Sequence, residues 1–477
     1  MMRKLLLRRW VSEPPGGRRR FAWYGPGLLW MLSAVGTGSI LFTPRVASVY
    51  RYDLLWLLLL VVFFMWIMIR EMARFTIVTG YTMLDGMNRL PGPRGWAVWL
   101  IFVPQLLAAA VGIAGLSAVM GGAMASFLPG SGRLHGVLVV LACTAFTASG
   151  RYGLLESVSR KMAMVLLVMV VVSAAMVFPD VAEPAQGLLP QWPADPDYYV
   201  ILPWVGTILA GSMGIVWFGY WTATRGYGGG LVGRERDEEV VDRETGSRHR
   251  RQSRRTRLRH AEDWINVMSG AAALGVLGGL VVLLAFMILG AELLAPGGQL
   301  PEGTDVAVDL ASMFSGIWGP SGKWLLLAAV VVALGGSVLA NQDGWGRSFA
   351  DMTLILLRPQ RRRPGPVLEW FKNLERRSGW RLLDRLMLKR GYIIGVTGVV
   401  PVAILLLFRD PVKVMSASGI IAAAHTPFIV LAALFVNRTR LPRPVRPGLF
   451  MTLAAAAAGL FYCGFAVLYL LDLMAAL

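Results

Sequence analysis

Two apolar stretches of this sequence are each interrupted by glycines and small polar residues. Glycine near the middle of a helix weakens it, and the backbone groups that it frees in hydrocarbon must be satisfied by protein or by a ligand. Paired interruptions at corresponding places in two halves of a membrane chain predict a binding site between them. The residues that would form it are Gly36, Thr37, Gly38 and Ser39 in the first stretch and Gly211, Ser212, Met213 and Gly214 in the sixth.

A histidine in the tenth stretch, His425, adds an imidazole to this candidate set. Imidazole nitrogen together with the Met213 thioether favours a softer transition-metal ion over Mg2+ or Ca2+, which prefer oxygen ligands. No carboxylate is among these residues, so a small polar or anionic solute is an open alternative at the positive ends of half-helices. The glycines are also explained by close helix packing, and His425 by a hydrogen bond to a backbone carbonyl.

The elements that must position these residues are membrane-spanning helices. The chain of 477 residues is 56% hydrophobic, and its mean hydropathy of +0.57 exceeds that of ordinary soluble proteins. Eleven apolar stretches are long enough to cross roughly 30 Å of hydrocarbon. They cover residues 25–50, 53–79, 96–128, 134–149, 162–178, 198–224, 264–292, 324–357, 392–408, 412–436 and 449–474.

The distribution of basic residues orients this predicted stack of helices. Of the 47 Lys and Arg residues, 40 lie in or beside connections on one side, and that side includes the N-terminus. The positive-inside rule therefore predicts a cytoplasmic N-terminus and, with eleven spans, a C-terminus outside, in a protein expected in a bacterial plasma membrane. The formal net charge of +19 follows from topology and indicates contact with anionic inner-leaflet lipids, with no need for a nucleic-acid partner.

The same pattern divides the chain into four parts. Residues 1–24 form a basic cytoplasmic N-terminus, 25–198 the first five spans, 199–440 the next five, and 441–477 the eleventh span. Two long basic cytoplasmic loops are expected at 226–262 and 358–390. The sequence leaves the oligomeric state open.

Charged and aromatic residues within the spans are further candidates. Asp343 and Arg347 share one face of the eighth span, which predicts an ion pair with a possible role in gating or coupling. Tyr220 follows the second interruption and either packs or lines the path of a guest. No nucleotide-binding loop, nucleophile elbow or H-E-x-x-H pattern is present, so the sequence predicts neither an enzyme nor a bound cofactor.

Three segments together resemble the Nramp family of divalent-metal transporters. They are Gly25-Pro26-Gly27-Leu28-Leu29 at the start of the first span, residues 73–84 (ARFTIVTGYTML) after the second, and Ala424-His425-Thr426-Pro427-Phe428 in the tenth. The resemblance implies an all-α LeuT-type fold, in which two inverted repeats of five helices, with broken first and sixth helices, are followed by an eleventh helix. It also implies a secondary transporter that moves divalent metal cations by alternating access.

The chain departs from the family at the residues that should bind metal. The family's D-P-G-N falls on Gly36-Thr37-Gly38-Ser39, and its M-P-H falls on or near residues 213–216 (MGIV), so the aspartate, proline and histidine are absent. The third span also lacks Asp and Glu. We therefore expect a divergent member with an altered substrate site, in which Met213 and His425 remain as candidate metal ligands. Two alternatives stay open, namely a carrier of a small organic solute and a non-transporting membrane receptor.

Overall fold

A computed structural model describes most of the chain. The described residues are 8, 10–34, 38–150, 153–209, 211–231, 252–298, 300–301, 306–357, 369, 373, 375–377, 383–408 and 410–476. Within these residues the secondary structure is helical, with no strand. Gly36, Thr37 and much of the two predicted basic loops lie outside them.

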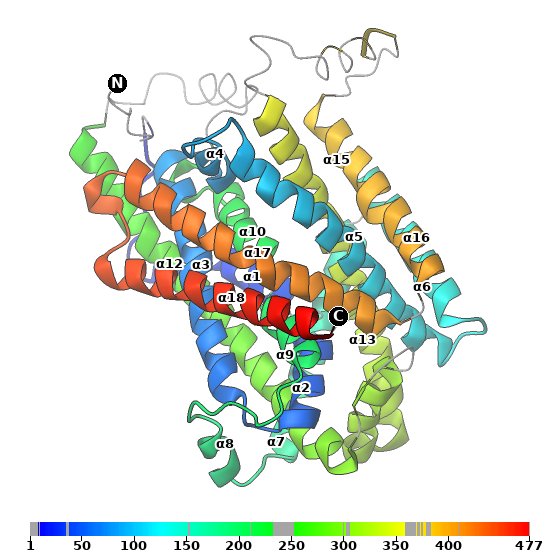
Figure 1. The fold of residues 1–477 in the computed structure, drawn as a ribbon. Coiled ribbons are helices and arrows are strands. Elements are labelled where there is room, and N and C mark those ends of the chain that lie inside the picture. Colours follow the sequence, from blue (N-terminus) through cyan, green and yellow to red (C-terminus); the bar gives the residue numbers. More distant parts are fainter. Residues whose placement is uncertain are drawn as a thin grey trace.

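Long α-helices make up the bundle in Figure 1. The α-helices are α1 (Gly25–Ala34), α2 (Thr43–Tyr50), α3 (Leu55–Thr79), α4 (Met83–Met87), α5 (Trp96–Ala125), α6 (Gly132–Ser149), α7 (Gly153–Met176), α8 (Ala182–Gln186), α9 (Tyr198–Thr207), α10 (Gly211–Thr224), α12 (Arg254–Leu289), α13 (Val306–Leu357), α15 (Arg385–Ile394), α16 (Val400–Leu407), α17 (Pro411–Arg440) and α18 (Leu449–Ala476).

Short π and 3-10 segments connect or extend these helices. The π-helical segments are η2 (Gly38–Phe42), η4 (Gly290–Leu294) and η8 (Gly395–Val399). The 3-10 segments are η1 (Gly17–Trp23), η3 (Tyr227–Gly229), η5 (Ala295–Gly297) and η9 (Arg443–Val445).

Nine helices in the described part of the chain are long and apolar enough to cross a membrane, and each coincides with a predicted span. In the other two predicted spans the described residues are mostly helical. Those of the span 25–50 belong to α1, η2 and α2, and the span at 162–178 lies mostly within α7. Apolar length therefore located the helices, because hydrocarbon requires each backbone group to be satisfied within its own segment.

A helix begins inside each of the two predicted basic loops. α12 begins at Arg254, inside the predicted loop 226–262, because the Ser253 hydroxyl accepts a hydrogen bond from the Thr256 amide and caps the helix. α15 begins at Arg385, inside the predicted loop 358–390, where the Asp384 carboxylate accepts from the Leu386 amide. Helix-capping residues set both boundaries, and the basic side chains that follow them continue as helix.

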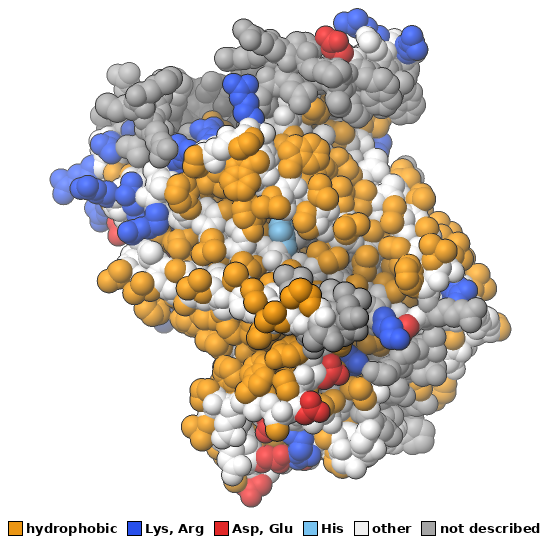
Figure 2. Space-filling view, in the orientation of Figure 1, with side chains coloured by type: hydrophobic (Ala, Val, Ile, Leu, Met, Phe, Trp, Pro, Cys, Tyr) orange, Lys and Arg blue, Asp and Glu red, His pale blue; other side chains and the backbone are white. Residues whose placement is uncertain are grey.

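Charge is separated along the molecule. Figure 2 shows hydrophobic side chains over the middle of one face, with Lys and Arg gathered mainly toward the upper end and Asp and Glu toward the lower end. α4 lies at the upper end and α8 at the lower end (Figure 1). An apolar belt between two charged ends is the surface that a bilayer requires.

The N-terminal segment is fastened to the basic end of the bundle. The Arg8 guanidinium donates to the carbonyls of Gly228 (3.0 Å) and Thr76 (2.9 Å). The Ser12 amide donates to the Gly228 carbonyl, and the Trp264 indole donates to the Ser12 carbonyl. The segment thus links the end of α3, the turn after α10 and the beginning of α12.

Candidate functional site

The sixth span is interrupted where the glycine cluster predicts. α9 ends at Thr207 and α10 begins at Gly211, and between them Leu209 has a left-handed φ of +55°. Gly211 itself has a φ of +56°, a conformation that glycine adopts at little cost. The interruption leaves the carbonyl end of α9 and the amide end of α10 next to each other in the chain, as in the discontinuous helices of carriers.

The predicted interruption of the first span at Gly36 and Thr37 lies outside the described residues, and helix flanks it on both sides. α1 ends at Ala34, η2 begins at Gly38, and Ser39 in η2 is fully buried. The two spans are cross-connected by indole hydrogen bonds. Trp30 of α1 donates to the Gly214 carbonyl of α10 (3.0 Å), and Trp204 of α9 donates to the Thr43 hydroxyl of α2 (3.1 Å).

A buried polar cluster lies beside the sixth-span interruption. The Gln105 amide nitrogen of α5 lies 2.6 Å from the Ser212 hydroxyl of α10 and 2.8 Å from Nδ1 of His425 on α17. Their exposed fractions are 0% for Gln105, 2% for Ser212 and 7% for His425. Three different helices therefore place neutral polar side chains at one point within the membrane-spanning region.

The hydrogen bonds of this cluster determine its donors and acceptors. Nε2 of His425 lies 3.1 Å from the Leu100 carbonyl, which only accepts, so Nε2 carries the proton and Nδ1 of the neutral ring holds a lone pair. The Gln105 NH2 group donates to that lone pair and to Ser212. Within the described structure the Gln105 carbonyl oxygen is buried and has no hydrogen-bond partner. The cluster therefore has a free acceptor in the Gln105 oxygen and a hydroxyl donor in Ser212.

Proline accounts for the carbonyl that holds His425. Pro104 lies inside α5 and has no N–H, so the Leu100 carbonyl, four residues earlier, lacks its usual helical donor. The imidazole of His425 supplies a donor in its place. The sequence signal for this arrangement is the dipeptide Pro104-Gln105 in an otherwise apolar span, and our sequence analysis did not single out Gln105.

The remaining predicted ligand, Met213, occupies a different environment. It is 2% exposed and belongs to the continuous apolar core, one residue after Ser212. Among the described residues no three His, Cys, Asp or Glu side chains gather as a metal-binding group. The ligand set of Met213 with His425 thus stays a prediction, and the structure brings together Gln105, Ser212 and His425 instead.

The predicted gating residues lie apart from this cluster, near the basic end. Nε of Arg347 lies 2.6 Å from the Asp343 carboxylate, so the expected ion pair is present, and Lys389 at the start of the ninth span joins it. Tyr220 faces Asp351 one turn of α13 further on than Arg347. These contacts join α10, α13 and α15 at that end of the bundle.

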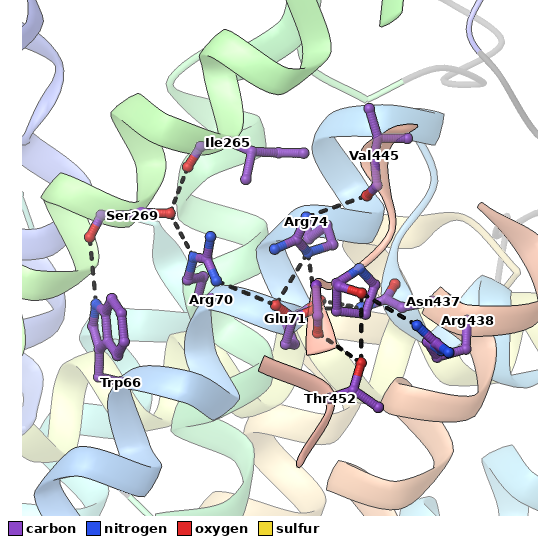
Figure 3. A network of polar contacts seen from close by, with 12 residues as sticks. Trp66, Arg70, Glu71, Arg74, Ile265, Ser269, Asn437, Arg438, Val445 and Thr452 are labelled. Carbon is purple, nitrogen blue, oxygen red and sulfur yellow. Dashed lines mark hydrogen bonds and ion pairs between the residues drawn. The ribbon is translucent and has the colours of Figure 1, made fainter. Parts of the chain in front are cut away.

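A second charged network lies where α3, α12 and α17 meet (Figure 3). The Glu71 carboxylate accepts two hydrogen bonds from Arg74, at 2.9 and 3.1 Å, and one from the Asn437 amide. Arg70 lies 3.7 Å from the same carboxylate and donates to Ser269 of α12. Glu71 and Arg74 are both under 6% exposed, so this network holds charge within the protein by pairing it.

A third network lies at the opposite end, where Arg51 connects two spans. Arg51 donates to Glu183 of α8, to Glu292 of η4 and to the Ala291 carbonyl. The hydrogen bond from Arg51 is the main cause that lowers the pKa of Glu183 below its ordinary value. The two partners are 36% and 44% exposed, so water screens this pair.

Comparison with known proteins identifies the family that shares this fold. The family model described as "Natural resistance-associated macrophage protein-like", Nramp, matches residues 27–342. An uncharacterised protein of Pasteurella multocida is 26% identical over 188 residues, and that match spans 39% of this chain and 41% of the relative.

Solved structures agree in fold. A manganese transporter of Eremococcus coleocola, crystallised with an aromatic bis-isothiourea compound, is 14% identical, with a TM-score of 0.61 over 97% of this chain and 89% of that one. A transporter of the nucleobase-cation-symport-1 family is 12% identical, with a TM-score of 0.50 over 97% of this chain and 95% of that one. The predicted all-helical LeuT-type fold is confirmed.

Proposed function

The chain belongs to the Nramp family of integral membrane transporters, and from that premise we propose that it carries divalent metal cations across a membrane by alternating access. The family consists of transporters and not of enzymes, which agrees with the absence of catalytic motifs in the sequence. The fold-level likeness to a manganese transporter supports a metal as cargo. The substrate site would be altered, because the usual aspartate is replaced at residues 36–39.

The observation that carries this proposal is the cluster of Gln105, Ser212 and His425 at the sixth-helix interruption. Its N–H donors are already used, since His425 donates to Leu100 and the Gln105 NH2 group donates to Ser212 and His425. What it offers to a guest in this arrangement is the Gln105 amide oxygen, which has no partner in the described structure, because the lone pair of His425 already accepts from the Gln105 NH2 group. The free amide oxygen suits a cation or a hydrogen-bond donor, whereas an anion would find one remaining donor among these three side chains, the Ser212 hydroxyl.

The ligand types narrow the class of cation. Imidazole nitrogen with neutral oxygen suits transition ions such as Mn2+, Fe2+, Co2+ and Zn2+. Ca2+ takes six to eight oxygen ligands, commonly with carboxylates, and Mg2+ keeps much of its water. We expect Mn2+ and its neighbours in the first transition row to be preferred over both.

The proposed orientation places the N-terminus in the cytoplasm and Leu477 outside, in a bacterial plasma membrane. The gathering of Lys and Arg at the end that holds the N-terminal segment supports this assignment. The same basic end would face anionic lipids of the inner leaflet. Glu183, Glu292 and α8 would then lie outside.

A second candidate cargo is a neutral polar solute that donates hydrogen bonds. The observation that favours it is the lack of any carboxylate in the described cluster, because charge on the protein is the commonest means of dehydrating a divalent ion. A solute with N–H or O–H groups would satisfy the free Gln105 oxygen without that cost. Measuring which class of ligand stabilises the protein separates the two candidates.

Uptake into proteoliposomes tests the proposal. We expect saturable Mn2+ or Co2+ uptake that falls roughly tenfold or more in His425→Ala, since a change at a metal ligand or its immediate support typically costs 10–100-fold in affinity. His135→Ala is the matched control, because His135 is also buried but lies at the beginning of α6. Uptake of no divalent ion by the wild type, or equal loss in both variants, would contradict the proposal.

A further inference from the structure

The carbonyl oxygen of Gln105 is a buried hydrogen-bond acceptor without a donor in the described structure. Gln105 is fully buried on α5, and in the described structure its NH2 group makes two hydrogen bonds while its oxygen makes none. A buried carbonyl without a donor is uncommon in folded proteins and requires a reason. A bound guest that interacts with this oxygen would supply that reason.

In the present arrangement Gln105 also blocks the best metal ligand nearby. Its NH2 group lies 2.8 Å from Nδ1 of His425, so it occupies the lone pair that a cation would need. Nε2 carries the proton and is bonded to Leu100, so it is not available as a ligand. A cation reaches His425 only when the Gln105 NH2 group moves away from Nδ1.

A half turn of the amide accomplishes this exchange without moving the helix. The terminal torsion of glutamine is broad and roughly two-fold, so the oxygen and nitrogen can change places. The oxygen would then lie about where the nitrogen now lies, near both Ser212 and Nδ1 of His425. Two lone-pair atoms at that separation repel each other unless a cation lies between them.

The spacing matches that of two ligands on one metal ion. Metal–nitrogen and metal–oxygen bonds of about 2.0–2.2 Å place neighbouring ligands about 2.9 Å apart when the angle between them is near 90°. The observed separation of the Gln105 amide from Nδ1 of His425 is 2.8 Å, and its separation from the Ser212 hydroxyl is 2.6 Å. The Gln105 amide therefore already lies near coordination distance of both His425 and Ser212.

We propose that Gln105 is a direct ligand of the transported cation and that its side-chain amide rotates by a half turn about its terminal torsion when the cation binds. The bound ion is held by the Gln105 oxygen, Nδ1 of His425 and the Ser212 hydroxyl, and it is a divalent transition cation that accepts both nitrogen and neutral oxygen. This inference rests on the proposed function and names its ligand set. Without the ion, the NH2 group returns and satisfies the two acceptors.

The test is Co2+ and Mn2+ binding by the full-length protein in lipid nanodiscs, measured by calorimetry. Gln105→Leu removes the oxygen at similar volume, and we expect at least tenfold weaker Co2+ binding. Gln105→Glu supplies two acceptors and no competing NH2 group, and we expect at least tenfold tighter binding. The visible absorption of bound Co2+ reports its ligands directly, and we expect it to differ between the wild type and Gln105→Glu.

Gln342→Leu is the matched control. Gln342 is an equally buried amide, but it is fully bonded to Thr144, Thr147 and the Thr397 carbonyl on neighbouring helices. Its replacement should lower stability and leave Co2+ affinity unchanged. Gln342→Leu thus measures how much affinity is lost merely because a buried amide has been removed.

The outcomes separate this inference from the proposed function. Unchanged Co2+ binding in Gln105→Leu, together with loss in His425→Ala, would overturn the role of Gln105 and leave metal transport standing. Tighter binding in Gln105→Leu would show that the amide only competes with the metal, which also overturns it. If Gln105→Leu does not fold, unchanged or weaker binding by Gln105→Glu overturns it. Lack of Co2+ and Mn2+ binding by the wild type would remove the proposed function itself.

Discussion

The buried Glu71 network yields the sharpest prediction of stability. Glu71→Gln keeps the shape of the side chain but removes the negative charge between Arg70 and Arg74 (Figure 3). Both members of the Glu71–Arg74 pair are under 6% exposed, and removing one partner of a buried pair costs about 3–5 kcal/mol because a charge is left unpaired. We expect a loss of folding free energy of that size.

The same substitution at the other end of the molecule provides the control. Glu183→Gln breaks the Arg51 pair, whose partners are 36% and 44% exposed, and pairs of this kind are worth about 0–1 kcal/mol. Thermal and denaturant unfolding of the purified variants in detergent would measure both. If Glu183→Gln destabilises the protein as much as Glu71→Gln, burial does not govern these pairs and the reasoning fails.

Three further outcomes follow from backbone strain and ionisation. Gly228→Ala places a Cβ 2.9 Å from the Ile77 carbonyl at a φ of +65°, so it should destabilise the protein in thermal unfolding more than Gly226→Ala, which has a φ of +92° and open space. If the two substitutions lowered the stability equally, the close approach of Gly228 to the Ile77 carbonyl would not contribute to it. Gly211→Ala meets only ordinary contacts at a φ of +56°, so its cost should be about 1–2 kcal/mol of left-handed strain, and Gly211→Asn should cost less. A larger loss of folding free energy in unfolding experiments would indicate that neighbouring atoms leave no room for a Cβ at Gly211. The Arg51 pair holds the pKa of Glu183 below its ordinary value of 4.5, so its contribution is present above that value and is lost as pH falls through the lowered pKa. Wild type and Glu183→Gln should therefore converge in thermal stability in acid, and a difference that persists there would contradict the assignment.

The helices and their interruptions were predictable because each depends on local sequence. A stretch of apolar residues long enough for hydrocarbon specifies a spanning helix by itself, as in α3 and α5. Gly211 marks a break because its φ of +56° suits glycine above other residues. The Asp343–Arg347 pair was predictable for the same reason, since residues four apart share a helix face.

The partners of the candidate site were not predictable, because they come from helices far apart in the sequence. Gln105 and His425 are 320 residues apart, and only the packing of α5 against α17 brings them together. The local signal was the single amide side chain of Gln105 after Pro104. Its meaning depended on which side chain would donate to the Leu100 carbonyl that the proline leaves without a helical donor. Ser212 was predicted as a site residue from its neighbour Gly211, while Gly36 and Thr37 lie outside the described residues.

The charged networks and the neutral cluster follow one rule that bears on how the carrier would move. Charged pairs occupy the two ends, at Glu71 and at Arg51, while the cluster beside the interruption contains neutral groups. A carrier must return without cargo, and neutral side chains bonded to one another avoid the desolvation cost of an unpaired charge within the bilayer. Turning the Gln105 amide lets such a site offer acceptors to a cation and satisfy itself when the cation has gone.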